Sequence, residues 1–242
     1  MRGDLITLVS SPTSFRVEFK PSKGILRVYN KTTKQAMDVD LNIDASKRVK
    51  GKHSDFLPNF YYIERVFFYS GMNFVTSTYR KKTDVVAAYV TTLGGSKKIK
   101  VGTVERLRED GFFSYNKAVC NTRIICMLSD YTLATLDMPA SGRNAFMKFV
   151  DNYDRANGKG SFERDGVDFR ISGVNKMADS NNFEPIFEQI QISDLPQGKE
   201  KIIEAIAIWL SYCKLLRPQP TFTNYEDVDS DSGFPENEPD SY

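Results

Sequence analysis

Lysines and arginines are concentrated in three stretches of this 242-residue chain, and aromatic residues accompany them in the first and third. They are TYRKK at 78–82, SKKIK at 96–100 and VERLREDGFFSYNK at 104–117. Lysine and arginine neutralise phosphates and release counterions, while an aromatic ring lets any base stack, at about 1–3 kcal/mol per base. The combination indicates a groove for single-stranded nucleic acid with little sequence preference. For any single residue, the alternative is a core aromatic or a solvated lysine.

The residues expected to contact nucleic acid fall into four sets. Phosphate contacts are expected from Lys97, Lys98, Lys100, Arg106, Arg108, Lys117 and Arg123, and stacking from Tyr79, Phe112 and Tyr115. The basic run Arg80, Lys81 and Lys82 follows Tyr79 directly. Lys176 lies in an expected hairpin loop, where it could clamp the strand, because the loops of small β-barrels often line the binding groove.

Charge divides the chain into a basic body and an acidic tail. The chain holds 33 Lys and Arg against 31 Asp and Glu, but the last basic residue is Arg217, and seven of the acids follow it. Residues 1–217 therefore carry a net charge of about +9. This asymmetry suggests a polyanion-binding body with an acidic interaction tail. From Pro218 onward, too little apolar surface is present to offset chain entropy, which predicts disorder.

We expect the tail to occupy the empty groove and, once displaced, to recruit other proteins. The residues concerned are the acids Glu226, Asp227, Asp229, Asp231, Glu236, Glu238 and Asp240, with Phe234 and Tyr242 as apolar anchors.

Catalytic and metal-binding patterns are poorly represented. His53 is the one histidine and lies in a polar run beside lysines. One histidine without a CxxC pair argues against structural zinc, and no phosphate-cradling glycine motif is complete. We therefore expect no enzyme, no cofactor and no metal. The alternative is a metal-dependent nuclease using Glu163, Asp165 and Asp168.

The cysteine count and the hydropathy pattern bear on the compartment. Three cysteines do not make a disulfide framework in a chain of this length, and an odd count fits a reducing compartment. The N-terminus lacks the features of a signal peptide, and the longest apolar stretch is too short to cross a bilayer. We expect a cytoplasmic protein, in the host cell if the chain is viral.

The elements that must position these residues are mostly strands. Alternating or β-rich patterns predict strands near 15–19, 25–30, 60–70, 83–92, 118–130, 166–173 and 183–193. Apolar stripes of helical period predict helices at 141–155 and 198–216. The fold class is mainly β with a few helices (α+β). Residues 1–217 form the body and 218–242 the tail.

Three stretches carry a resemblance to a known family. GGSKKIKVGTVERLREDGFFSYNKAV at 94–119, GRNAFMKFV at 142–150 and FEPIFEQI at 183–190 resemble segments of phage-type single-stranded DNA-binding proteins. The resemblance covers roughly residues 60–242. It implies an OB-like β-barrel with appended amphipathic helices, which coats DNA cooperatively in replication, recombination or repair. Proteins of those processes would be partners of the tail, and self-association and RNA binding are compatible with it.

Two features depart from that family. The tail mixes its acids with Ser, Pro and Asn rather than ending in a compact acidic tip, and the expected hairpin at 15–41 has no counterpart. The alternative function is a phage structural or assembly protein whose acidic tail docks on a partner. Salt-sensitive DNA binding distinguishes the first function from the second.

Overall fold

The computed structural model describes residues 11–42, 59–71, 73–91, 97–113, 118–128, 130–190 and 198–216. The described strands are β1 (Phe15–Lys20), β2 (Ile25–Asn30), β3 (Ala36–Asp40), β4 (Asn59–Gly71), β5 (Phe74–Thr76), β6 (Val85–Thr91), β7 (Lys97–Thr103), β8 (Val119–Met127), β9 (Leu133–Met138), β10 (Phe169–Lys176) and β11 (Phe183–Gln189). The described helices are α1 (Val104–Glu109), α2 (Ala140–Asn157), α3 (Ser161–Asp165) and α4 (Gly198–Leu216). The α+β class is confirmed.

The described strands form one open sheet in the order β3-β2-β1-β9-β8-β4-β5-β6-β7, with the β10–β11 hairpin joined to the start of β4. Among the described pairs, β1 and β9 run parallel and the others antiparallel. The 15–41 segment is thus part of the central sheet through β1. No ladder among the described residues closes the sheet, so the expected OB-like barrel is not confirmed.

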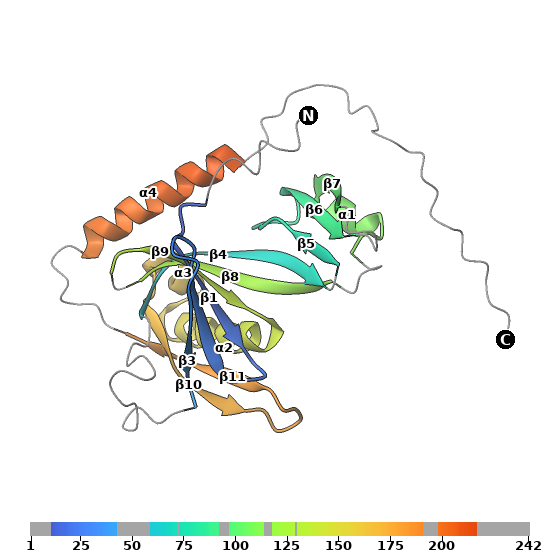
Figure 1. The fold of residues 1–242 in the computed structure, drawn as a ribbon. Helices are drawn as coiled ribbons and strands as arrows, with labels where there is room; N and C mark the ends of the chain where they lie inside the picture. The colour runs from blue at the N-terminus through green and yellow to red at the C-terminus, as the bar shows by residue number, and fades with distance from the viewer. Residues whose placement is uncertain are drawn as a thin grey trace, which may run out of the picture.

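Strand β4 connects the β1–β9–β8 part of the sheet to the β5–β7 strands and to the β10–β11 hairpin. It pairs with β8 along most of its length, with β10 at Asn59 and Phe60, and with β5 at Ser70 and Gly71. A register shift between Tyr62 and Glu64 bends it, as β-bulges do. The β5–β7 strands and α1 therefore extend to one side of the molecule, away from β1–β3 (Figure 1).

The main core lies between the sheet and α2. Phe146 of α2 is fully buried, together with Phe162, Phe169 and Ile124. The ring centroids of Phe146 and Phe169 are 5.6 Å apart, within the range of favourable aromatic pairs. Helix α2 contacts β8 and also β11, so the sheet and the hairpin cover it on two sides (Figure 1).

Helix α4 covers the opposite face of the sheet. Its residues Ala205 and Trp209 are buried against β4 and β8, and Trp209 packs with Val66 and Ile125. The Trp209 Nε1–H donates to the Glu64 carboxylate. No helix in the described ranges combines the length and apolar composition needed to cross a bilayer.

A smaller core stabilises the β5–β7 unit. Phe74, Val86 and Leu107 are buried there, with Leu107 supplied by the short helix α1. The Thr103 side chain caps α1 by accepting a hydrogen bond from the Arg106 backbone N–H. This core positions the basic residues of β7 and α1.

Candidate nucleic-acid interface

The basic residues of β7 and α1 gather around one carboxylate. The Nζ of Lys100 lies 3.4 Å from Asp110 and the Nε of Arg106 lies 3.2 Å from it. Lys100 also lies 6.0 Å from the centroid of the Phe112 ring, which is half-buried against Phe74. Arg106 remains largely exposed, since 72 % of its side-chain surface is accessible. The structure therefore brings three of the expected residues together on this unit.

Lys82 and Arg108 line a hollow on the same β5–β7 unit. It has a volume of about 290 Å³, and Glu105 and Glu109 also line it. Lys82, Arg108 and the neighbouring Lys81 are exposed and have no ion pair with another described residue. These cations are free to attract a polyanion, although two carboxylates offset the charge of the hollow itself.

Tyr79 does not have the exposed ring that stacking on a base requires. Only 7 % of its surface is accessible, and its ring stacks on Tyr69 with centroids 5.6 Å apart. Its hydroxyl lies 3.6 Å from the sulfur of Cys120, and burial raises the pKa of the phenol. The ring therefore belongs to the core of the β5–β7 unit and is not exposed for stacking in this structure.

Arg80 is committed to an internal ion pair. Its guanidinium donates two hydrogen bonds to Glu64, and its Nη2 lies 3.1 Å from the sulfur of Cys213 on α4. The hydrogen bonds with Glu64 raise the pKa of Arg80 above its ordinary value. The side chain joins β4 to α4, so a phosphate contact would have to displace Glu64.

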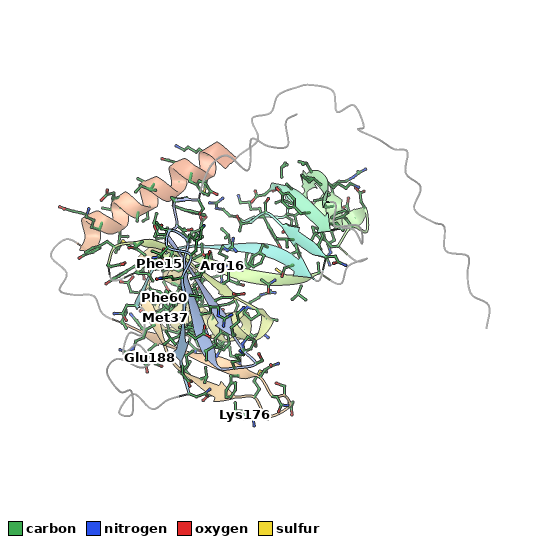
Figure 2. The ribbon with its side chains drawn as sticks, in the orientation of Figure 1. Phe15, Arg16, Met37, Phe60, Lys176 and Glu188 are labelled. Atoms are coloured by element: carbon green, nitrogen blue, oxygen red, sulfur yellow. The ribbon has the colours of Figure 1, made fainter. Side chains whose placement is uncertain are left out.

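Other expected residues lie elsewhere. Lys176 ends β10, and Figure 2 shows it at the end of the β10–β11 hairpin, away from β7 and α1. Lys97 and Lys98 begin β7, but their side chains are outside the described residues, as are Tyr115 and Lys117. All tail residues, from Glu226 to Tyr242, and His53 also lie outside them.

The structure adds a groove that the sequence did not reveal. It has a volume of about 460 Å³ and lies over β1, β4, β5, β8 and β9. The side chains that define it are Arg16, Phe68, Ser70, Asn121, Arg123 and Asp137, and it is called here the arginine groove. Of these six, only Arg123 was expected to contact nucleic acid.

Strand alternation places the arginine groove on the α4 face of the sheet. In β8, Ile124 packs in the α2 core, whereas Ile125 packs against Trp209. Arg123 is two residues from Ile125 and shares its face. The groove thus continues the surface that α4 covers at one end.

Two arginines converge on one buried carboxylate in the arginine groove. Asp137 accepts from Arg123 Nε at 2.5 Å and Nη2 at 2.8 Å, and from Arg16 Nε at 2.9 Å. The exposed fractions of these side chains are 5 % for Asp137, 25 % for Arg123 and 44 % for Arg16. The guanidinium carbon of Arg123 lies 4.7 Å from the centroid of the half-buried Phe68 ring. A cation and an aromatic ring therefore lie side by side at the surface.

A third cation adds to the positive charge of this cluster. Burial lowers the pKa of Lys31, and the charges of Arg123 and Arg16 lower it too, while Asp137 opposes them. The Lys31 ammonium donates to the Thr13 hydroxyl. Three cations surround one buried carboxylate, so the cluster favours an incoming anion.

The acids considered for a nuclease do not form a metal site. Glu163 accepts from the Tyr62 hydroxyl and pairs with Arg65, whereas Asp165 pairs with Arg164. Asp168 is half-buried, with one carboxylate oxygen left without a partner, and burial raises its pKa to about 6. Within the described ranges, no group of three or more His, Cys, Asp or Glu side chains could hold a metal ion.

Comparison with protein-family models, with curated proteins and with solved structures found no match. The functional interpretation therefore depends on the geometry of this chain.

Proposed function

We propose that this chain is a non-enzymatic single-stranded DNA-binding protein that coats DNA in phage-type replication, recombination or repair, in the cytoplasm of the host cell. The observation that carries the proposal is the stack of Arg123 on Phe68 beside a second guanidinium, Arg16. Any base can stack on such a platform, while cations neutralise the backbone. RNA meets the same requirements, so both polymers are to be compared.

The curved sheet gives a shape that suits this role. We propose that it is an open relative of an OB-like barrel, in which a curved sheet face presents a groove to a single strand. The support is that the sheet bends around α2 until the hairpin meets the β1–β2 turn, where the Phe183 N–H donates to the Pro21 carbonyl at 2.8 Å.

The β5–β7 unit would extend the interface electrostatically. Residues 73–113 contain eight Lys and Arg against four Asp and Glu. Lys81, Lys82 and Arg108 are exposed, and Lys100 and Arg106 share a single carboxylate. In this proposal the unit attracts the backbone, and the arginine groove holds a base.

The proposal is tested by fluorescence anisotropy with labelled oligo-dT and oligo-U across a salt series. Phe68→Ala should weaken binding by roughly 1–3 kcal/mol, the scale of one lost stacking contact. Arg16→Gln should weaken it and reduce the steepness of the salt dependence by about 0.7, as expected when one phosphate contact to a single strand is lost.

A matched control is Arg170→Gln. Arg170 is 45 % exposed in an ion pair with Glu188 on the β10–β11 hairpin, so it resembles Arg16 in exposure but lies outside the arginine groove. It should leave affinity unchanged. Absence of binding by the unaltered chain at low salt would overturn the proposed function.

A second candidate function, a phage structural or assembly protein, is favoured by one observation. Strand β7 is an edge strand of the described sheet, and its Ile99 and Val101 side chains are 51 % and 50 % exposed. Edge strands with exposed apolar residues are ready to pair with another chain. Stable self-assembly measured by light scattering, without DNA binding, would support this candidate.

A further inference from the structure

We infer that the arginine groove is a site for a single nucleotide, with the phosphate group at Arg16 and the base at Phe68. For a DNA strand the inference rests on the proposed function, whereas for a free nucleotide it stands alone. The shared chemistry is a phosphate group beside a planar base. The experiment below distinguishes a nucleotide within a strand from a free nucleotide.

The phosphate end is defined by donors that Asp137 leaves unused. Asp137 takes two hydrogen bonds from Arg123 but only the Nε–H of Arg16. The Nη2 of Arg16 forms an ion pair with Glu18 at 3.7 Å, which is too long for a hydrogen bond. Neither terminal nitrogen of this exposed guanidinium donates a hydrogen bond to another described residue, and their fork matches two phosphate oxygens.

The local charge favours an anion at this end. Arg16, Arg123 and Lys31 face Asp137, with Glu18 as the nearest second carboxylate. Even with Glu18 included, the cluster has one more cation than carboxylates. Lys31 is less basic than usual because of its burial and its cationic neighbours, and a bound phosphate would offset that repulsion.

The base end is defined by Phe68 and its neighbours. The Arg123 guanidinium lies over the ring, with its carbon 4.7 Å from the ring centroid, and Val75 is 50 % exposed at the same groove. Asn121 donates from Nδ2 to the Ser70 hydroxyl at 2.6 Å, which fixes both polar side chains beside the ring. An aromatic ring and an exposed apolar side chain beside fixed polar groups can hold and orient a planar base.

The size of the arginine groove limits its contents. Its volume of about 460 Å³ falls within the range of about 300–1,000 Å³ typical of small-ligand sites. We therefore assign one nucleotide to each protomer. The rest of a strand would follow the surface cations.

The alternative is that Arg16, Asp137 and Arg123 only hold β1, β9 and β8 together. That role would change stability when Arg16 is replaced, but it would not make ligand binding depend on a phosphate group. A readout of ligand discrimination therefore separates the two roles.

The experiment is calorimetric titration of the full chain with thymidine, dTMP and inorganic phosphate, repeated for Arg16→Gln, Phe68→Leu and the control Arg170→Gln. We expect dTMP to bind roughly tenfold or more tightly than thymidine, the scale of a hydrogen bond to a charged group. Arg16→Gln should make the affinities for dTMP and thymidine equal while leaving thymidine binding unchanged. Phe68→Leu should weaken thymidine and dTMP by the same factor, and Arg170→Gln should change nothing.

The inference is overturned if the unaltered chain binds dTMP no better than thymidine, or if Arg16→Gln and Arg170→Gln alter the ratio equally. Should Arg16→Gln fail to fold, Arg16→Lys keeps the charge without the fork, and an intermediate ratio is expected. Binding of dTMP without binding of oligo-dT would support the nucleotide site and reject the proposed function. Oligo-dT binding without a preference for dTMP over thymidine would support the proposed function and reject the nucleotide site.

Discussion

At the scale of single residues, Asp137 is the carboxylate that holds the arginine groove together. It is buried, and it holds Arg123 and Arg16 through three hydrogen bonds. Asp137→Asn leaves two guanidiniums around a neutral group. We expect the free energy of unfolding in urea to fall by roughly 3 kcal/mol, because Arg123 keeps a poorly solvated, uncompensated charge.

The matched control for Asp137 is Asp38→Asn. Asp38 receives two hydrogen bonds at 2.8 Å from Arg27, but both side chains are 42 % exposed. Its loss should cost no more than about 1 kcal/mol. Equal losses for the two variants would contradict the importance given to burial.

Asp168 predicts a pH dependence of stability. Burial raises the pKa of Asp168 to about 6 from an ordinary value of 3.8. Its contribution to stability is therefore full below about pH 3.8 and is lost as the pH rises through about 6. Asp168→Asn should therefore stabilise the protein more at pH 8 than at pH 4. The gain in the free energy of unfolding over the unaltered chain should be larger at pH 8 by roughly 1–2 kcal/mol, after allowance for partial exposure.

Urea denaturation at pH 4, 6 and 8 checks the Asp168 prediction. Asp165→Asn, at an exposed carboxylate beside Arg164, is the control and should leave the profile unchanged. An identical pH profile for Asp168→Asn and the unaltered chain would reject it.

Residue roles were harder to predict than residue types. The pattern of basic and aromatic residues could not separate Tyr79, whose ring is buried, from a surface ring. Arg123 was among the expected phosphate contacts, and its contact with nucleic acid stays a prediction. Arg16 and Asp137 are 121 positions apart, so no local pattern connects them. The detectable signal was the alternation of Arg16 and Glu18 with the buried Val17 and Phe19, which marks a polar sheet face.

At the scale of elements, Trp209 is the largest buried contact between α4 and the sheet. Trp209 is 5 % exposed and packs on Val66 and Ile125, and its indole donates to Glu64. Trp209→Ala should lower the free energy of unfolding by about 3–5 kcal/mol, through the cavity and the lost hydrogen bond.

Leu210 is the neighbouring control for Trp209, since it is 49 % exposed on the outer side of α4. Leu210→Ala should cost less than about 1 kcal/mol. Denaturant unfolding of both variants makes the comparison, and similar costs would show that α4 does not pack on β4 as described.

The sequence predicted most helices and strands, but it did not predict which strands pair in the sheet. Hydrophobic period identified α2, α4 and most strands, because each of these buries one face. The short helices α1 and α3 have too few residues to show a period. The parallel pairing of β1 with β9 is decided by tertiary packing of Val17 and Leu136, which the sequence of either strand alone does not specify.

At the scale of the whole molecule, the separation of charge predicts competition between tail and ligand. A chain ending at Arg217 lacks seven acids and should bind oligo-dT more tightly than the full chain at low salt, because the ligand no longer displaces a tethered polyanion. Anisotropy measurements on both chains check this. The gain should disappear at high salt, and equal affinities at low salt would reject the competition.

The parallel pairing of β1 with β9 also has a consequence for biosynthesis. The meander β1–β2–β3 leaves the ribosome before β9, and the residues of β9 that pair with β1 are made 119 positions later. At a synthesis rate of about 5–20 residues per second, this edge of β1 waits for about 6–24 seconds. During that interval a nascent chain exposes Val17 and Phe19 beside an unpaired backbone, so chaperone demand should be greatest before residue 138 emerges.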